Sequence, residues 1–279
     1  MHYLIVGNMG MLGRCLTRVL SKEKCRVTGT DIQEFDITDR EKTSREIQRI
    51  RPDVLINCAA YTDVDGCEMH QEEAYAVNAT GPGNLAWVLS KIGARLIHIS
   101  TDFVFDGQKQ SPYSETDPTG PLSIYGRSKL KGEEAIAEAM ENYLIVRTSW
   151  LFGVDGNNFV KTMLKLADNM DRLEVVDDQK GRPTYARDLA EALKDLSRLE
   201  YRGIVHFSNS GECTWYRFAC KIMEYAGKQT TILPTSTSRF PRPAQRPSNS
   251  AMDLTTVTRL LKRSPRAWEE ALRDCIQAL

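Results

Sequence analysis

Residues 3–13 read YLIVGNMGMLG, an apolar run followed by a turn with glycine at positions 7, 10 and 13. The run Tyr3–Val6 is typical of a buried strand, and the spacing of apolar residues over 11–21 is typical of a helix. A glycine-rich turn between a strand and a helix lets the backbone approach a pyrophosphate, which then rests on the helix N-terminus. The spacing GxxGxxG is one residue wider than the usual fingerprint GxGxxG, so by itself the stretch indicates a dinucleotide site only weakly.

The strand and helix pattern continues through the first half of the chain. Apolar runs predict strands at 26–30, 54–57, 95–99 and 144–147, and helical spacing predicts helices at 40–50, 72–92 and 125–140. Apolar strands that alternate with helices predict an α/β fold with a Rossmann-type, doubly wound parallel sheet. Asp31 follows the second strand, where an acidic residue accepts hydrogen bonds from the adenosine ribose. Its carboxylate repels a 2′-phosphate and so favours NADH, although NADPH use stays open.

The pattern becomes less regular after Gly153. Helices are predicted at 159–167, 186–196 and 215–226, and the proline-rich stretch 234–250 is predicted to be a loop. We therefore predict an NAD(P)-binding Rossmann domain over residues 1–153, which also carries the catalytic residues. Residues 154–279 are predicted to form mainly a substrate-binding lobe, with some segments returning to the Rossmann core.

Composition excludes several classes of function. Lysine plus arginine equals aspartate plus glutamate, at 37 each, so no basic excess favours binding to nucleic acid or to a membrane surface. No stretch resembles a signal peptide or reaches the ~20 apolar residues that span a bilayer. The seven cysteines form no CxxC pair, which indicates reduced thiols and a cytoplasmic location. The four histidines are scattered without metal-ligand spacing, so we expect no metal.

Tyr125 and Lys129 form a YxxxK pair at the start of a predicted helix. Residues four apart share one helix face. A free phenol has a pKa of about 10, and a neighbouring ammonium favours its ionised form. A tyrosine tuned in this way gives a proton to a carbonyl oxygen while hydride arrives from a nicotinamide. Taken alone, the pair is more typical of a solvated helix face.

A second group of polar residues, Ser100-Thr101-Asp102, ends the fourth predicted strand. Ligands of doubly wound sheets bind at this edge. A hydroxyl there is placed to hydrogen-bond the same carbonyl oxygen that Tyr125 protonates. Thr101 and Ser100 are competing candidates, because alternation along a strand directs their side chains to opposite faces.

The motifs GNMGMLG (7–13), STDFVFDG (100–107) and YGRSK (125–129) occur in the order found in extended short-chain dehydrogenase/reductases, and the chain resembles that family. More narrowly, it is similar to the dTDP-4-dehydrorhamnose reductase family over nearly its whole length. The stretches that distinguish this narrower family are DDQKGRPTYARDLA (177–190), GIVHFSNSGECTWYRFA (203–219) and FPRPAQRPSNSAMD (240–253). The resemblance implies reduction of the C4 ketone of a dTDP-linked 4-keto-6-deoxy sugar, dTDP-4-dehydro-L-rhamnose, by NADPH or NADH, in a homodimer.

The resemblance also implies roles for individual residues. The catalytic residues would be Tyr125 as proton donor, Lys129 as its partner and ribose ligand, and Thr101 as the hydroxyl that orients the carbonyl. The expected cofactor-binding residues are Gly7, Gly10, Met11, Leu12, Gly13, Asp31, Asp36, Ile37, Ala60, Tyr61 and Thr62, together with Tyr125 and Lys129. The expected substrate-binding residues are Thr101, Asp102, Tyr125, Trp150 and Arg246, with Asn249 beside them.

Some of these positions have ordinary structural explanations as well. An aromatic residue such as Trp150 after a core strand is as typical of packing as of sugar contact, and a loop arginine such as Arg246 is usually solvated. Two positions depart from the common family pattern. Asn8 stands where a small residue is frequent, and Phe103 stands where tyrosine is frequent.

Besides a simple NAD(P)-binding sensor, two other functions are compatible with the same motifs. One is a reductase of another nucleotide-linked 4-keto sugar, since the loops that read the base and the sugar carry no specificity that we can derive. The other is a non-catalytic regulatory subunit resembling the β subunit of methionine adenosyltransferase, which shares this fold. The presence of Thr101, Tyr125 and Lys129 together favours an enzyme.

Overall fold

The computed structural model describes all residues 1–279 and is built around one six-stranded parallel sheet. The strand order is β10-β5-β4-β3-β1-β2. The strands are β1 (His2–Val6), β2 (Arg26–Thr30), β3 (Val54–Asn57), β4 (Arg95–Thr101), β5 (Tyr143–Thr148) and β10 (Gly203–His206). The chain runs from β1 outward to β2 and then inward to β3, so the direction of winding changes beside β1. This confirms the predicted α/β class with a doubly wound sheet, in which ligands bind at the carboxyl edge near such a change.

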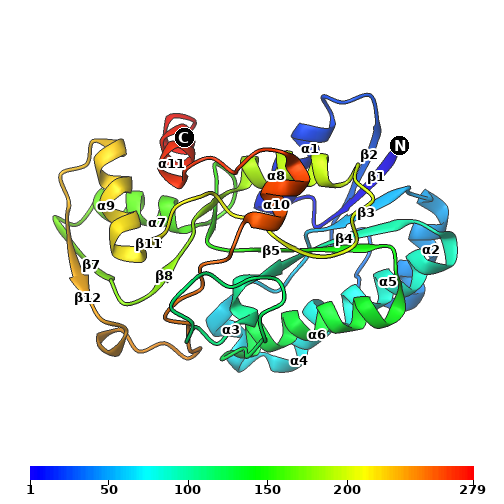
Figure 1. Cartoon of the computed structure of the whole chain (residues 1–279), viewed down its shortest axis with the longest axis horizontal. Coiled ribbons are helices and arrows are strands. Elements are labelled where there is room, and N and C mark those ends of the chain that lie inside the picture. Colours follow the sequence, from blue (N-terminus) through cyan, green and yellow to red (C-terminus); the bar gives the residue numbers. More distant parts are fainter.

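Helices cover both faces of the sheet (Figure 1). One face carries α2 (Arg40–Ile50), α5 (Gly81–Ile92) and α6 (Ile124–Ala139), and the other carries α1 (Met11–Leu20), α8 (Ala186–Leu196) and α10 (Thr255–Leu261). Both faces bury apolar side chains, which is why the central strands read as continuous apolar runs.

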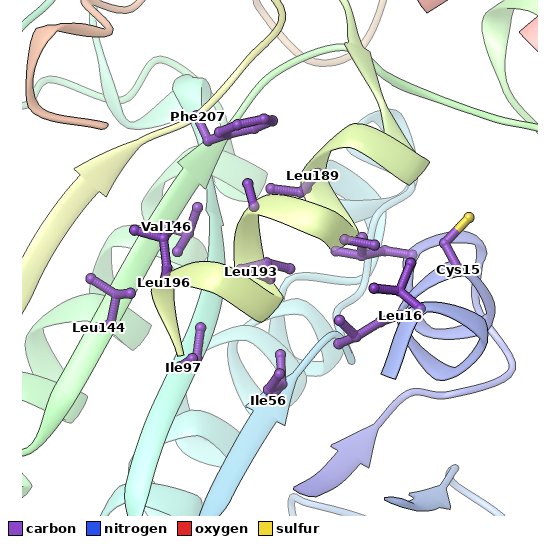
Figure 2. Close-up of a cluster of buried hydrophobic side chains, with 14 of the residues drawn as sticks. Cys15, Leu16, Ile56, Ile97, Leu144, Val146, Leu189, Leu193, Leu196 and Phe207 are labelled. Atoms are coloured by element: carbon purple, nitrogen blue, oxygen red, sulfur yellow. The ribbon is translucent and has the colours of Figure 1, made fainter. Parts of the chain in front are cut away.

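The second half of the chain contributes to this core. Figure 2 shows Leu189, Leu193 and Leu196 of α8 lying over Val146 and Ile97 of the sheet. The strand β10 and the helix α10 also belong to the sheet and its covering layer. Segments after residue 153 thus return to the sheet, while the division of the chain into two functional units stays a prediction.

The remaining second-half elements form a smaller lobe at one end of the molecule (Figure 1). Its buried core lies among α7 (Phe159–Ala167), α9 (Trp215–Ala226) and α11 (Trp268–Gln277). Three two-stranded sheets complete it: β7 (Arg172–Val176) with β12 (Thr231–Thr235), β6 (Leu151–Phe152) with β9 (Thr184–Tyr185), and β8 (Lys180–Gly181) with β11 (Cys213–Thr214). None of the helices combines the length and apolarity needed to cross a bilayer.

The helix predicted over 72–92 is interrupted in the structure. Short helices α3 (Val64–Met69) and α4 (Gln71–Tyr75) lead into a π-helical turn at Ala76–Thr80, after which α5 begins. The buried Asn78 in this turn accepts a hydrogen bond from the Tyr61 N–H at 2.9 Å and donates to the Tyr61 carbonyl at 3.1 Å. Pairing with the loop after β3 therefore accounts for the irregular turn, and π-helical turns recur at functional sites.

The proline-rich stretch differs from its prediction at one end. Pro234 lies in β12, which pairs only with β7. A proline fits a two-stranded ribbon because one side of the strand needs no N–H donor.

Candidate active site

The turn after β1 is tightly packed against its surroundings. Gly7 has a φ of +77°, and a Cβ added to it would lie 2.7 Å from the Ala59 nitrogen. A Cβ on Gly13 would lie 2.2 Å from the Gly7 carbonyl oxygen. The glycines therefore bring the start of α1 against the turn and the loop after β3.

The turn fits a pyrophosphate. The helix α1 begins at Met11 without a side-chain cap and without an acidic residue in its first turn. The first N–H groups of a helix lack partners within the helix and carry partial positive charge, which favours an anion. The residues predicted to hold the pyrophosphate, Gly10, Met11 and Leu12, lie at this end.

Asn8, one of the two departures from the family pattern, is accommodated by Gly29 in β2. A Cβ added to Gly29 would lie 2.2 Å from the Asn8 side-chain nitrogen. The absence of a side chain at position 29 therefore makes room for the larger residue at position 8. Asp31 lies close by, and its carboxylate accepts hydrogen bonds from the N–H groups of Met9 at 3.0 Å and Ile32 at 2.9 Å.

A cavity of about 320 Å³ opens beside this turn at the carboxyl edge of β1, β2 and β3. Seven of the predicted cofactor residues line it: Gly7, Gly10, Asp31, Asp36, Ile37, Ala60 and Tyr61. Sequence reasoning missed further lining residues, among them Phe35, Cys58, Ala59, Glu73 and Val77. Phe35 lies in a loop and Val77 in the π-helical turn, whereas Cys58 and Ala59 directly follow a predicted strand at the edge where ligands bind. The predicted residues Met11, Leu12, Gly13 and Thr62 do not line this cavity.

We expect Gly13→Ala to weaken cofactor binding. The added methyl group meets the Gly7 backbone, and overpacking of this kind costs about 1–3 kcal/mol, or roughly a tenfold loss of affinity for each 1.4 kcal/mol. Calorimetric titration with NADPH and NADH measures the change. The control is Gly83→Ala on α5, where the new Cβ would meet only the side chain of Ala135 at 3.2 Å. Wild-type affinity in Gly13→Ala would contradict the assigned role of the turn.

Thr101 and Tyr125 meet at the end of β4. Ser123 caps α6 by accepting a hydrogen bond from the Gly126 N–H, which places Tyr125 in the first helical turn. The Thr101 hydroxyl lies close enough to the Tyr125 phenol to lower the pKa of that phenol. Phe103 packs edge-on against the Tyr125 ring, with the centroids 5.7 Å apart. The hydroxyls of Thr101 and Tyr125 are therefore placed to bind one carbonyl oxygen together.

Ser100 points the other way. Its hydroxyl donates to the buried Glu133 carboxylate, which also accepts hydrogen bonds from Arg147. The side chain is thus engaged inside the protein, away from Tyr125. Of the two competing hydroxyls, Thr101 is the one that faces the phenol.

Lys129 is not among the groups that shift the pKa of Tyr125. Burial raises the pKa of Tyr125, the hydrogen bond to Thr101 opposes this, and the Asp102 carboxylate adds to it. The Lys129 Nζ instead donates to the Ile99 carbonyl at 2.6 Å and lies 3.2 Å from the His98 Nε2. Burial lowers the pKa of Lys129 to about 8, against opposing effects of Glu133 and Cys58. Tyr125 is accordingly a neutral phenol, the form that can donate a proton.

Asp102 is buried beside the two hydroxyls. Its Oδ2 has no hydrogen-bond partner, and its Oδ1 accepts from the Thr101 hydroxyl at 3.1 Å. Burial raises the pKa of Asp102 to about 7, against smaller opposing effects of the nearby Ser250 and Thr101 side chains. An unpartnered carboxylate oxygen at this place fits a contact with a polar ligand.

We expect Asp102→Asn to change how stability depends on pH. Between about pH 4 and pH 7 an Asp102 carboxyl in the unfolded chain ionises while the folded one keeps its proton, so the wild type loses stability as pH rises. At about 1.4 kcal/mol for each pKa unit, the free energy of unfolding of Asp102→Asn should gain roughly 4 kcal/mol on the wild type between pH 4 and pH 8. Urea unfolding at the two pH values measures this difference. If Asp102→Asn and the wild type differ by the same free energy of unfolding at both pH values, the raised pKa of Asp102 is contradicted.

Trp150 and Arg246 already have partners in the protein. Trp150 adopts a φ of +47° and stacks on Trp215 of the smaller lobe, with ring centroids 3.6 Å apart. Arg246 forms an ion pair with Asp65, its Nη1 and Nη2 donating at 2.6 and 2.9 Å. Asn249 donates to the Lys109 carbonyl. Their contact with a substrate stays a prediction.

The whole chain is similar to known proteins. Residues 1–279 match the model of a family described as the RmlD substrate binding domain. The spore coat polysaccharide biosynthesis protein SpsK of Bacillus subtilis is 42% identical over 98% of this chain and 96% of that protein. A dTDP-4-dehydrorhamnose reductase of Clostridium acetobutylicum superposes with a TM-score of 0.97 at 41% identity, covering 100% of this chain and 99% of that one. The Bacillus anthracis dTDP-4-dehydrorhamnose reductase in complex with NADP gives a TM-score of 0.97 at 39% identity, with the same coverage.

Proposed function

This chain belongs to the RmlD family of dTDP-4-dehydrorhamnose reductases, and from that premise we propose how its residues carry out the reaction. It is an oxidoreductase that reduces the C4 ketone of dTDP-4-dehydro-L-rhamnose to dTDP-L-rhamnose with NADPH or NADH. The observation that carries the proposed mechanism is the meeting of the Thr101 and Tyr125 hydroxyls at the edge of the sheet that also forms the cofactor cavity.

The proton comes from Tyr125. The Thr101 hydroxyl binds the C4 oxygen and orients the carbonyl, and the neutral Tyr125 phenol transfers its proton to that oxygen as the alcohol forms. A nicotinamide cofactor, when bound, would supply the hydride. Lys129 would hold its ribose, and the uncapped start of α1 would hold its pyrophosphate.

Residues at the carboxyl edge of the sheet and in the proline-rich loop are proposed to contact the sugar nucleotide. Asp102 has a free carboxylate oxygen close to the two hydroxyls, and Trp150 lies where β5 leads into the lobe. We assign sugar contacts to Asp102 and Trp150, and a diphosphate contact to Arg246, whose guanidinium would then share its charge with Asp65. The family resemblance further supports a cytoplasmic homodimer, and sedimentation of the purified chain tests the dimer.

The test of this function is the oxidation of reduced nicotinamide, followed by its absorbance, with enzymatically generated dTDP-4-dehydrorhamnose. NADPH and NADH are compared in parallel, and GDP- and UDP-linked 4-keto sugars serve as competing substrates. Rapid oxidation with the dTDP-linked ketone supports the proposal and ranks the two cofactors. Preference for another nucleotide sugar would overturn the substrate, and binding of cofactor without oxidation of it would favour a regulatory role.

A further inference from the structure

Lys129 is a buried cation whose direct contacts carry no charge. The residue is 1% exposed, and its Nζ donates to the Ile99 carbonyl at 2.6 Å and lies 3.2 Å from the His98 Nε2. His98 is fully buried, and burial lowers the pKa of its ring well below the usual range, so the ring is neutral. A buried charge is costly unless an opposite charge compensates for it. An anion close to Lys129, though not in contact with it, is therefore expected.

Glu133 supplies this anion. It lies four residues after Lys129 on α6, and residues at that spacing share one helix face. The two side chains are also anchored on adjacent residues of β4, since Lys129 donates to the Ile99 carbonyl and Glu133 accepts from the Ser100 hydroxyl. Consecutive Cα atoms are about 3.8 Å apart, so these anchors hold the ammonium and the carboxylate close together. Glu133 is 4% exposed, and the attraction between the two charges is thus little screened by water.

Cys58, after β3, is the other group that would favour the ammonium as an anion, and it carries no charge. Burial raises the pKa of its thiol to about 12, so the thiol keeps its proton at neutral pH. Burial lowers the pKa of Lys129 to about 8, and the Glu133 carboxylate opposes this. Lys129 is therefore mostly an ammonium at pH 7, and Glu133 is the anion that favours this form.

The carboxylate of Glu133 is itself fixed in place. Arg147 on β5 donates to it through Nε at 3.0 Å and Nη2 at 2.6 Å. An arginine fork of this kind sets the orientation of the carboxylate as well as its position. Because α6, β4 and β5 all contribute contacts, one immobile carboxylate serves two buried cations, Arg147 and Lys129.

We propose that Glu133 is a positioning residue that acts through Lys129: it keeps the lysine an ammonium near neutral pH and so preserves the N–H donors that hold the nicotinamide ribose. An ammonium has three N–H donors, and the Ile99 carbonyl uses one of them. The others remain for ribose hydroxyls. The contact with the ribose rests on the proposed function, whereas the charge of Lys129 is a property of the chain by itself.

The first experiment measures that charge on the whole chain without cofactor or substrate. Carbon-13 spectra of the lysine Cε atoms report the titration of Lys129, assigned by the loss of its signal in Lys129→Met. Glu133→Gln keeps the shape and an oxygen acceptor for Ser100 and Arg147 but removes the negative charge. We expect the midpoint of Lys129 to fall by about one unit or more from its wild-type value of about 8. An unchanged midpoint would overturn the proposal.

Glu134→Gln is the matched control. It removes the same charge from the next residue of α6, but Glu134 is exposed and pairs with Lys131 at the surface. We expect no change in the midpoint of Lys129 in this variant. An equal fall in both variants would show that the net charge of the chain, and not the placement of Glu133, determines the charge of Lys129.

The second experiment separates an effect on the lysine from damage to the fold. Calorimetry measures NADPH affinity of Glu133→Gln and of the wild type at pH 6 and pH 8. If binding needs the ammonium and its midpoint falls by one unit, the variant should bind nearly as well as the wild type at pH 6 and roughly fivefold more weakly at pH 8. Asp102, with a pKa of about 7, titrates in both proteins and cancels from this comparison. An equal loss at both pH values would mean a structural role only and overturn the proposal.

If Glu133→Gln does not fold, the double variant Arg147→Met with Glu133→Leu takes its place, because it leaves neither charge of the ion pair alone. We expect the midpoint of Lys129 to lie below the wild-type value there too, and a midpoint at or above that value would refute the role of Glu133. A lowered midpoint without weaker NADPH binding at pH 8 would uphold the control of Lys129 by Glu133 and overturn the placement of Lys129 at the ribose. The lysine titration is decisive whether or not the chain reduces a dTDP-linked sugar.

Discussion

Tyr125→Phe is expected to lower turnover with the dTDP-linked ketone by about 10²–10⁴-fold, the range over which a general acid contributes. The variant loses the one hydroxyl that can protonate the C4 oxygen, while Thr101 stays in place to bind it. The ring keeps its edge-on contact with Phe103, so the fold and the cofactor cavity should be preserved. Turnover from the oxidation of reduced nicotinamide, with cofactor affinity from calorimetry, measures the two effects separately.

Tyr3→Phe is the matched control. Tyr3 is a buried phenol at the opposite end of β1 from the glycine turn, where its hydroxyl bonds to that of Ser197 at 2.8 Å. Loss of this hydroxyl should reduce stability slightly and leave turnover unchanged. Normal turnover in Tyr125→Phe, or an equal loss in both variants, would refute Tyr125 as the proton donor.

Arg147→Met is expected to lower the free energy of unfolding by about 3–5 kcal/mol. Arg147 on β5 donates through Nε and Nη2 to Glu133 on α6, at 3.0 and 2.6 Å, and both side chains are nearly fully buried. The variant leaves the Glu133 carboxylate charged in the interior without its cation. Urea unfolding at neutral pH measures the loss.

The double variant Arg147→Met with Glu133→Leu provides the control. Replacing both partners of a buried ion pair by apolar residues is often neutral, because neither charge is then left alone. We therefore expect the double variant to recover most of the stability. Arg49→Met, which breaks an exposed pair with Glu46, should cost only about 0–1 kcal/mol. If Arg147→Met lowers the free energy of unfolding no more than Arg49→Met does, the buried ion pair does not hold α6 on the sheet.

The sheet was predictable because its strands carry an unambiguous signal. Strands buried on both faces read as apolar runs, and β1, β3 and β5 were predicted to within a residue or two. The two hydroxyls proposed to be catalytic were found by their position, since Thr101 ends a central strand and Tyr125 lies at the start of α6. Which of Ser100 and Thr101 faces the site was not predictable, because it depends on Glu133 and Arg147, which lie far along the chain.

Other features depend on contacts that local patterns do not encode. The π-helical turn at Ala76–Thr80 arises from the pairing of Asn78 with Tyr61, 17 residues away. The raised pKa of Tyr125 and the partners of Lys129 reflect burial, which a helical spacing of four residues cannot express. Helical spacing placed the phenol and the amine on one helix face, but burial among the surrounding side chains sets the pKa of each.

The stacked pair of Trp150 and Trp215 joins the end of β5 to the smaller lobe, with the rings within 8° of parallel. Two indoles so close share their electronic excitation, and their coupled transitions give a paired positive and negative band in circular dichroism. The other two tryptophans, Trp87 and Trp268, have no indole partner and do not contribute to such a band. Circular dichroism therefore reports whether the smaller lobe keeps its position against the sheet. Binding of a ligand that moves Trp150 away from Trp215 will remove this pair of bands from the circular dichroism spectrum. The measurement needs neither a label nor turnover of the substrate.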